Sequence, residues 1–130
     1  NWVKAEGFEY LGYIADPGPE MQTWSAMVVP IVYGGGTRIK ILDAFSKRCP
    51  VVSTRIGAYG IDATDNIHFL LADTAEQFAQ RCFQLMDNPS WGKTLADEAW
   101  TLLTQKYRWE TIGVEIRNVV SEVLKPICQP

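Results

Sequence analysis

A run of three glycines between an apolar segment and an amphipathic segment constrains this chain more than any other feature. The apolar, β-branched segment 27–31 predicts a buried strand. After the glycines, an amphipathic helix is predicted over 37–47, with Thr37 as its N-cap. This order is typical of an α/β fold at the edge where backbone N–H groups and the positive helix end meet an anion. The pattern therefore predicts a phosphate-bearing ligand, such as a nucleotide, at residues 34–38.

The residues alone leave other interpretations open. The glycine loop matches neither Gly-x-Gly-x-x-Gly nor a Walker pattern, so a simple tight turn explains it equally well. Asp43 shares a predicted helix face with Lys40 and Lys47, which is also what a solvated face of ion pairs would show. Arg38 opposes the helix dipole, which indicates either an anionic neighbour or a solvated side chain. Arg55 begins a loop that could line a cleft or simply lie on the surface.

Short strands and helices alternate along the rest of the chain. This alternation predicts an α/β fold, with a parallel sheet of about four strands, helices on both faces and a three-helix C-terminal tail. The predicted strands lie at about 8–13, 26–31, 50–54 and 68–71. The predicted helices lie at about 19–25, 37–47, 74–86, from Ser90 to a joint at Tyr107, and 109–124, where Pro126 ends the last helix.

Helical spacing and local signals predict caps and buried faces. Thr74 and Gln77 form a capping-box pattern, and Ser90 is expected to cap the following helix. Side chains predicted to face the core are Ile39, Leu42, Phe45, Leu95, Ala99, Leu102, Leu103, Trp109, Ile112, Ile116, Val119, Val120 and Val123. The tryptophans at 24, 91, 100 and 109 are expected to pack in the core, and Trp2 is uninformative.

Composition limits size and partners. The chain has 130 residues, 47% of them hydrophobic, which suits a single domain over 1–130 with its own core. A net charge of −3 argues against nucleic acid, since phosphate backbones require a basic face. Three separated cysteines match neither a disulfide framework nor a zinc site and favour a cytoplasmic protein. No transmembrane segment or signal peptide is expected. The absence of an initial Met suggests a piece of a longer protein.

Several blocks of this sequence resemble one protein family. They are Val29-Pro30, Tyr33-Gly34-Gly35-Gly36-Thr37-Arg38-Ile39-Lys40-Ile41-Leu42-Asp43-Ala44, Pro50-Val51-Val52-Ser53-Thr54, Gly57 and Gly60-Ile61. Together they resemble the C-terminal, donor-binding half of retaining group 1 (family four-like) glycosyltransferases of the two-Rossmann-domain class, GT-B. The resemblance runs from about residue 8 to 124 and is most specific between 29 and 61.

The resemblance implies roles for particular residues. The family motif has two glutamates, of which the second binds the ribose hydroxyls and matches Asp43 here. The first glutamate, which contacts the donor sugar, falls on Gly35, so this chain lacks it.

Diphosphate binding is implied for the segment Gly35, Gly36, Thr37 and Arg38, in which the amides of the last three residues match those that cradle the diphosphate. Lys40 is a further candidate, either for phosphate neutralisation or for support of Asp43. No catalytic residue and no metal ligand can be nominated.

The resemblance also implies an activity and partners. The expected function is sugar transfer from a nucleotide-diphosphate sugar with retention, in polysaccharide or glycolipid assembly, without a metal or another cofactor. This donor-binding portion is expected to be inactive without its N-terminal acceptor domain. The alternative is a non-catalytic nucleotide-binding, phospholigand-binding or assembly module on the same scaffold. The implied Rossmann-like sheet is partial, and its open edge at 26–31 predicts pairing with a second copy.

Overall fold

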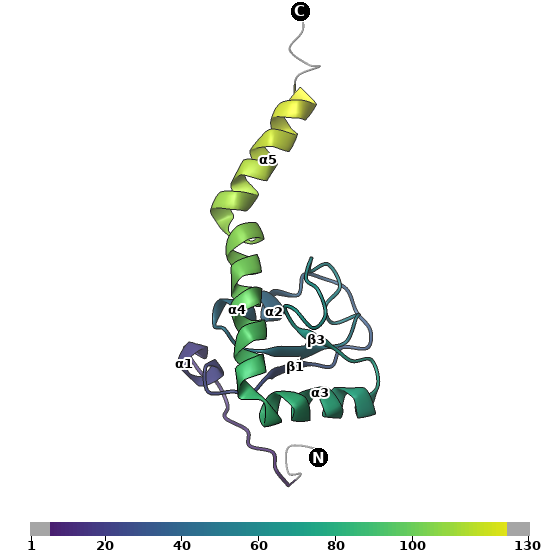
Figure 1. Cartoon of the computed structure of the whole chain (residues 1–130). Coiled ribbons are helices and arrows are strands. Elements are labelled where there is room, and N and C mark those ends of the chain that lie inside the picture. The colour runs from purple at the N-terminus through teal and green to yellow at the C-terminus, as the bar shows by residue number, and fades with distance from the viewer. Residues whose placement is uncertain (1–5, 125–130) are drawn as a thin grey trace, which may run out of the picture.

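The computed structural model describes residues 6–124, which form a small α/β body from which the last helix projects (Figure 1). The sheet lies between helices (Figure 1). In chain order the elements are α1 (Gly18–Met21), β1 (Met27–Val29), α2 (Ile39–Ser46), β2 (Val51–Ser53), β3 (Leu70–Leu71), α3 (Ala75–Asp87), α4 (Pro89–Lys106) and α5 (Trp109–Leu124).

The sheet is parallel, with the strand order β1-β2-β3. Val28 pairs with Val52, and Val52 pairs with Leu70 in the next strand. These strands confirm the predictions for 26–31, 50–54 and 68–71, although each is shorter than expected. The parallel α/β fold predicted from the alternation of elements is therefore confirmed.

The strand predicted at 8–13 is wrong. Within the described residues the segment joins no sheet, and Tyr13 is 92% exposed. An alternating apolar pattern produces a strand only where a neighbour supplies hydrogen bonds and a face to bury. Neither condition is met here, so the sheet has three strands instead of about four.

Helices cover both faces of the sheet, as predicted. Adjacent residues of β2 show the two faces, because Val51 belongs to one buried cluster and Val52 to the other. On the Val51 side lie α2 and the later part of α4; on the Val52 side lie α3 and the start of α4. The first cluster comprises Met21, Val29, Ile41, Ala44, Phe45, Cys49, Val51, Ala58, Phe69, Ala99 and Leu102, and the second comprises Val52, Leu70, Ala72, Leu85 and Leu95.

Helix α2 buries only part of the face predicted for it: Phe45 is buried as predicted and Leu42 partly so, but Ile39 is not. Ile41, Ala44 and Phe45 are buried, whereas Ile39 is 68% exposed. The helix starts at Ile39, and Arg38 is its N-cap residue without a side-chain capping bond, so Thr37 is not the cap. The spacing i, i+3, i+4 from Ile41 gives as good an apolar stripe as the predicted one, and the sheet selects it.

Of the two helix caps predicted from local sequence signals, one is confirmed and one is wrong. The Thr74 and Gln77 capping box at the start of α3 is confirmed. At α4 the cap is Asn88, whose side-chain oxygen accepts from the Trp91 N–H at 3.1 Å, so the prediction of Ser90 is wrong. Pro89 occupies the first turn, where its missing N–H costs nothing and its φ suits a helix.

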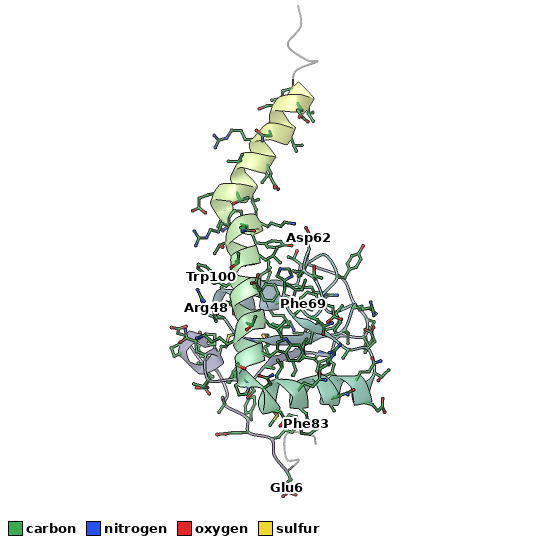
Figure 2. All side chains as sticks on the ribbon, in the orientation of Figure 1. Glu6, Arg48, Asp62, Phe69, Phe83 and Trp100 are labelled. Atoms are coloured by element: carbon green, nitrogen blue, oxygen red, sulfur yellow. The ribbon has the colours of Figure 1, made fainter. Side chains whose placement is uncertain are left out.

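Arg48 joins the end of α2 to α4. Its guanidinium lies 4.4 Å from the ring centroid of Trp100 (Figure 2) and pairs with Asp97. Its φ of +53° is in the left-handed region, where a helix usually ends on glycine. The contacts with α4 offset the strain of that conformation.

The terminal helices divide at the predicted joint. Leu95, Ala99 and Leu102 of α4 are buried as predicted. The bounds predicted for α5 are confirmed, but its buried face is wrong, because none of its residues is buried and Trp109 is 82% exposed. The helix leaves the body after Tyr107 (Figure 1), so no described element covers its apolar stripe. Trp24, Trp91 and Trp100 are half-buried, while Trp2 and Pro126 lie outside the described residues.

Candidate functional site

The carboxyl ends of the three parallel strands meet at one edge of the sheet. The glycine loop follows β1, the loop beginning at Thr54 follows β2, and Asp73 follows β3. In open α/β sheets this edge is where ligands bind. The candidate site is built from these loops and from the start of α2.

Thr54 ties the loop after β2 to the end of β1. Its hydroxyl donates to the carbonyl of Ile31 and accepts from the Gly57 N–H at 2.8 Å. The loop passes so close to β1 that a Cβ on Gly57 would lie 2.8 Å from the carbonyl oxygen of Val29. Only glycine fits there, which explains why Gly57 stands in this block.

Arg38 connects the glycine loop to the loop after β2. Its guanidinium donates to the carbonyl oxygens of Gly34 at 2.9 Å, Gly35 at 3.2 Å and Ile56 at 3.1 Å. The side chain is buried, with 8% of the residue exposed. Its Nε has no hydrogen-bond partner, and no carboxylate among residues 6–124 pairs with it. The solvated side chain considered from the sequence is therefore excluded.

The backbone N–H groups at the start of α2 are available. From Gly35 to Lys40, none of them donates a hydrogen bond within the described part of the chain, and the first bond of this turn runs from the Ile41 N–H to the Arg38 carbonyl at 2.9 Å. The loop is exposed from Gly34 to Thr37. Gly34 and Gly36 adopt φ values of +122° and +93°, which glycine tolerates best. The loop can therefore offer several donors to one anion.

Lys40 and Asp43 are exposed on α2, three residues apart and hence on the same side of the helix. The four ion pairs within residues 6–124 include neither of them, nor Lys47. The side chains of this helix face are therefore solvated without pairing with one another. The Asp43 carboxylate makes no hydrogen bond within the described residues, which leaves it able to accept one from a ligand.

Asp73 belongs to this edge but was not foreseen from the sequence. Its carboxylate accepts from the Arg55 N–H at 2.9 Å and from Arg55 Nε at 2.8 Å. These bonds, the backbone one first, hold the pKa of Asp73 below its ordinary value. The available signal was its position, directly after the last strand and before the Thr74 cap.

A cavity of about 360 Å³ opens where the loops meet. Its lining includes Arg55, whose side chain is otherwise largely exposed, and Ile56, whose carbonyl binds Arg38. Gly35, Gly36, Thr37, Arg38, Lys40 and Asp43 do not line it. Of the predicted residues, Arg38 contacts this cavity's lining, through its hydrogen bond to the Ile56 carbonyl.

Other reactive side chains have structural roles or none assigned. Nδ1 of His68 accepts from the Thr64 N–H at 2.9 Å. Burial raises the pKa of the Cys49 thiol. Among residues 6–124 no cluster of three potential metal-binding side chains occurs. Within the same range, every helix is too short or too polar to cross a membrane.

The fold and this edge define a parallel α/β domain with an exposed glycine loop at the carboxyl edge of its sheet. The sequence profile described as "Glycosyl transferases group 1" matches residues 2–88. Because this match covers more than half of the chain, the protein belongs to the group 1 glycosyltransferase family.

Two relatives put the match in proportion. A probable sucrose-phosphate synthase from Thermosipho melanesiensis is 28% identical over 85 residues, which are 65% of this chain and 19% of that protein. The crystal structure of the C-terminal domain of a group 1 family protein, LpcC, from Francisella tularensis has a TM-score of 0.66 and 22% identity. That similarity covers 76% of this chain and 53% of the other, and it supports the Rossmann-like fold. This chain therefore spans only part of either relative.

Proposed function

We propose that this chain is the donor-binding part of a glycosyltransferase that moves a sugar from a nucleotide-diphosphate sugar to an acceptor with retention of configuration. The observation that carries the proposal is the set of unbonded backbone N–H groups from Gly35 to Arg38, at the exposed N-terminus of α2. Such groups, together with the positive helix end, suit a diphosphate. Family membership supplies the class of ligand.

In this proposal each residue has one task. The amides of Gly35, Gly36, Thr37 and Arg38 hold the diphosphate. Asp43, free of ion pairs within the described residues, accepts hydrogen bonds from the ribose hydroxyls. Lys40 adds a positive charge in the first turn of α2, close to the phosphates. Binding of this kind uses protein donors and cations only, so it requires no metal.

The proposal assigns no catalytic group to this chain, which we expect to be inactive without the acceptor-binding part of the enzyme. The chain spans 19% of the curated relative, which leaves room for that part elsewhere in the protein. A cytoplasmic location and a role in polysaccharide or glycolipid assembly remain predictions.

Calorimetry of the intact protein with UDP and GDP tests the proposed binding mode. Asp43→Ala should weaken the binding free energy of the preferred nucleotide by at least about 1.5 kcal/mol, the contribution of a hydrogen bond to a charged group. Asp87→Ala is the matched control, because Asp87 is exposed at the end of α3, on the opposite face of the sheet from α2. Equal affinities of the Asp43→Ala and wild-type proteins would remove Asp43 from the site.

A second candidate, a non-catalytic nucleotide-binding or assembly module, is favoured by one observation. Gly35 stands where the family glutamate contacts the donor sugar, and a Cβ there would meet nothing within 4 Å. The space for a side chain is present, but the group is not. Transfer of sugar from a nucleotide sugar by the intact protein would support the enzyme, whereas binding of free UDP or GDP without turnover of any nucleotide sugar would support the module.

A further inference from the structure

We propose that Arg38 is a positioning residue for the diphosphate site: its buried guanidinium folds the glycine loop so that the amides of Gly35 and Gly36 face outward, and it places an unpaired positive charge behind them. The ligand class this selects is a group with at least two negative charges. The inference deepens the proposed function and rests on it for the identity of the nucleotide, but not for binding of the anion.

The orientation of the amides follows from the hydrogen bonds of Arg38. In a planar trans peptide the C=O of one residue and the N–H of the next point in opposite directions. Because the carbonyls of Gly34 and Gly35 accept from the guanidinium, the N–H groups of Gly35 and Gly36 point away from it. These are two of the amides that donate no hydrogen bond within residues 6–124.

A third bond anchors the arrangement to the rest of the molecule. Arg38 also donates to the carbonyl of Ile56, at a point where Gly57 is packed against the ends of β1 and β2. The guanidinium therefore fixes the glycine loop to the most tightly packed part of the neighbouring loop. A lysine cannot reproduce this, because its ammonium lacks the planar fork that reaches both loops.

The charge of Arg38 has no counterpart in the described residues. Carbonyl dipoles stabilise it in part, but no carboxylate pairs with it and Nε has no partner. A buried charge without an opposite charge is costly, and a cation at a helix N-terminus is disfavoured by the helix dipole. An anion on the outward amides would offset both costs. The positive charge is thus in place before the ligand arrives.

The test uses inorganic pyrophosphate as the probe and the amide NMR signals of Gly35 and Gly36 as the readout. Wild-type protein should show saturable shifts of both signals. Arg38→Met should lower the affinity for pyrophosphate at least about tenfold, which corresponds to the loss of one charged interaction. Arg38→Lys keeps the charge without the fork and should bind more tightly than Arg38→Met but less tightly than wild type. Lys93→Met, which removes an exposed charge from α4 near Pro50, at the opposite edge of the sheet from the glycine loop, should change the affinity less than about threefold.

Two controls separate this role from a purely structural one. Melting temperatures identify variants that lose affinity because they unfold. If Arg38→Met does not fold, the pyrophosphate affinity of Arg38→Lys still tests the role of the guanidinium. Partial recovery by lysine, with a steeper salt dependence than Arg38→Met, supports the positioning and charge role. The proposal would be overturned if Arg38→Met bound pyrophosphate with wild-type affinity. It would also be overturned if pyrophosphate did not shift the Gly35 and Gly36 amide signals of the wild-type protein. Pyrophosphate binding without any response to UDP or GDP would instead contradict the proposed function and leave this inference standing.

Discussion

At the residue scale, the last two glycines of the loop, Gly35 and Gly36, differ in backbone conformation. Gly36 has a φ of +93°, whereas Gly35 lies outside the left-handed region and a Cβ there would meet nothing within 4 Å. We expect Gly36→Ala to lower the free energy of unfolding by about 1–2 kcal/mol, the cost of the left-handed conformation. Gly35→Ala, the matched control, should stay within about 0.5 kcal/mol of wild type. Urea unfolding measures both, and equal losses would show that the glycines do not differ.

Gly57 makes a steric demand rather than a conformational one. An added methyl group would lie 2.5 Å from Ser53 Oγ and 2.8 Å from the Val29 carbonyl oxygen. Gly57→Ala should therefore lower the free energy of unfolding by about 1–3 kcal/mol, as overpacking does. Gly113→Ala, in open surroundings on α5, should be neutral or stabilising. A Gly57→Ala protein as stable as wild type would mean that the loop can move away from β1.

Residues whose environment is local could be predicted, and those fixed by distant parts of the chain could not. Thr74 and Gln77 lie three residues apart and form their capping box within one turn. Arg38, in contrast, is buried because the carbonyl of Ile56 meets it from 18 residues away. Neither that contact nor the Asp73 bonds to Arg55 leaves a trace in local spacing.

At the element scale, the periodicity found the helices but not always their buried faces. For α5 the predicted bounds are right, yet its apolar stripe is uncovered in the described structure. An apolar stripe indicates which face a helix would bury and says nothing of what covers it. For α2 two overlapping stripes fit the same residues, and only the contact with the sheet distinguishes them.

The caps of α3 and α4 give a direct test at this scale. Thr74→Ala should lower the free energy of unfolding by about 1 kcal/mol, because the Gln77 N–H loses its side-chain acceptor. Asn88→Ala should cost a similar amount at α4. Ser90→Ala should cost less than Asn88→Ala, because Ser90 does not cap the helix and its hydroxyl only donates to the Asn88 side-chain oxygen at 2.7 Å. Chemical denaturation of the three variants would contradict this account if Ser90→Ala were the most damaging.

The bonds between Arg55 and Asp73 predict an effect of acid. The pKa of Asp73 is lowered in the folded state, so its contribution is present above the ordinary pKa and is lost as the pH falls through the lowered one. Wild-type melting temperature should therefore fall more steeply below about pH 4 than that of Asp73→Asn. Melting curves between about pH 2 and 7 test this, and parallel profiles would show that the carboxylate contributes nothing.

At the scale of the whole molecule, the parallel order of the sheet was predictable because alternating strands and helices allow few topologies. The open edge was implied by the family resemblance rather than by this alternation, and it is present within the described residues, where β1 pairs only with β2. The Met27 N–H donates toward β2 and the Val29 carbonyl accepts from it, so the backbone of Val28 faces the free edge.

That edge keeps the predicted pairing with a second copy open to test. Val28 is 52% exposed at the free edge, which is the feature that invites pairing. Light scattering of this chain should give the mass of a dimer. Val28→Pro removes a backbone N–H donor from the edge strand, so it should shift the measured mass toward that of the monomer. A mass equal to one chain at all concentrations would contradict the prediction.

The central claim is that the outward amides at the mouth of α2 receive a nucleotide diphosphate. A crystal structure of the intact protein with UDP or GDP tests it most directly. The account predicts diphosphate oxygens within hydrogen-bond distance of the Gly35 to Arg38 N–H groups, with the ribose hydroxyls on the Asp43 carboxylate. A nucleotide bound elsewhere on the protein, with these amides facing only solvent, would contradict it.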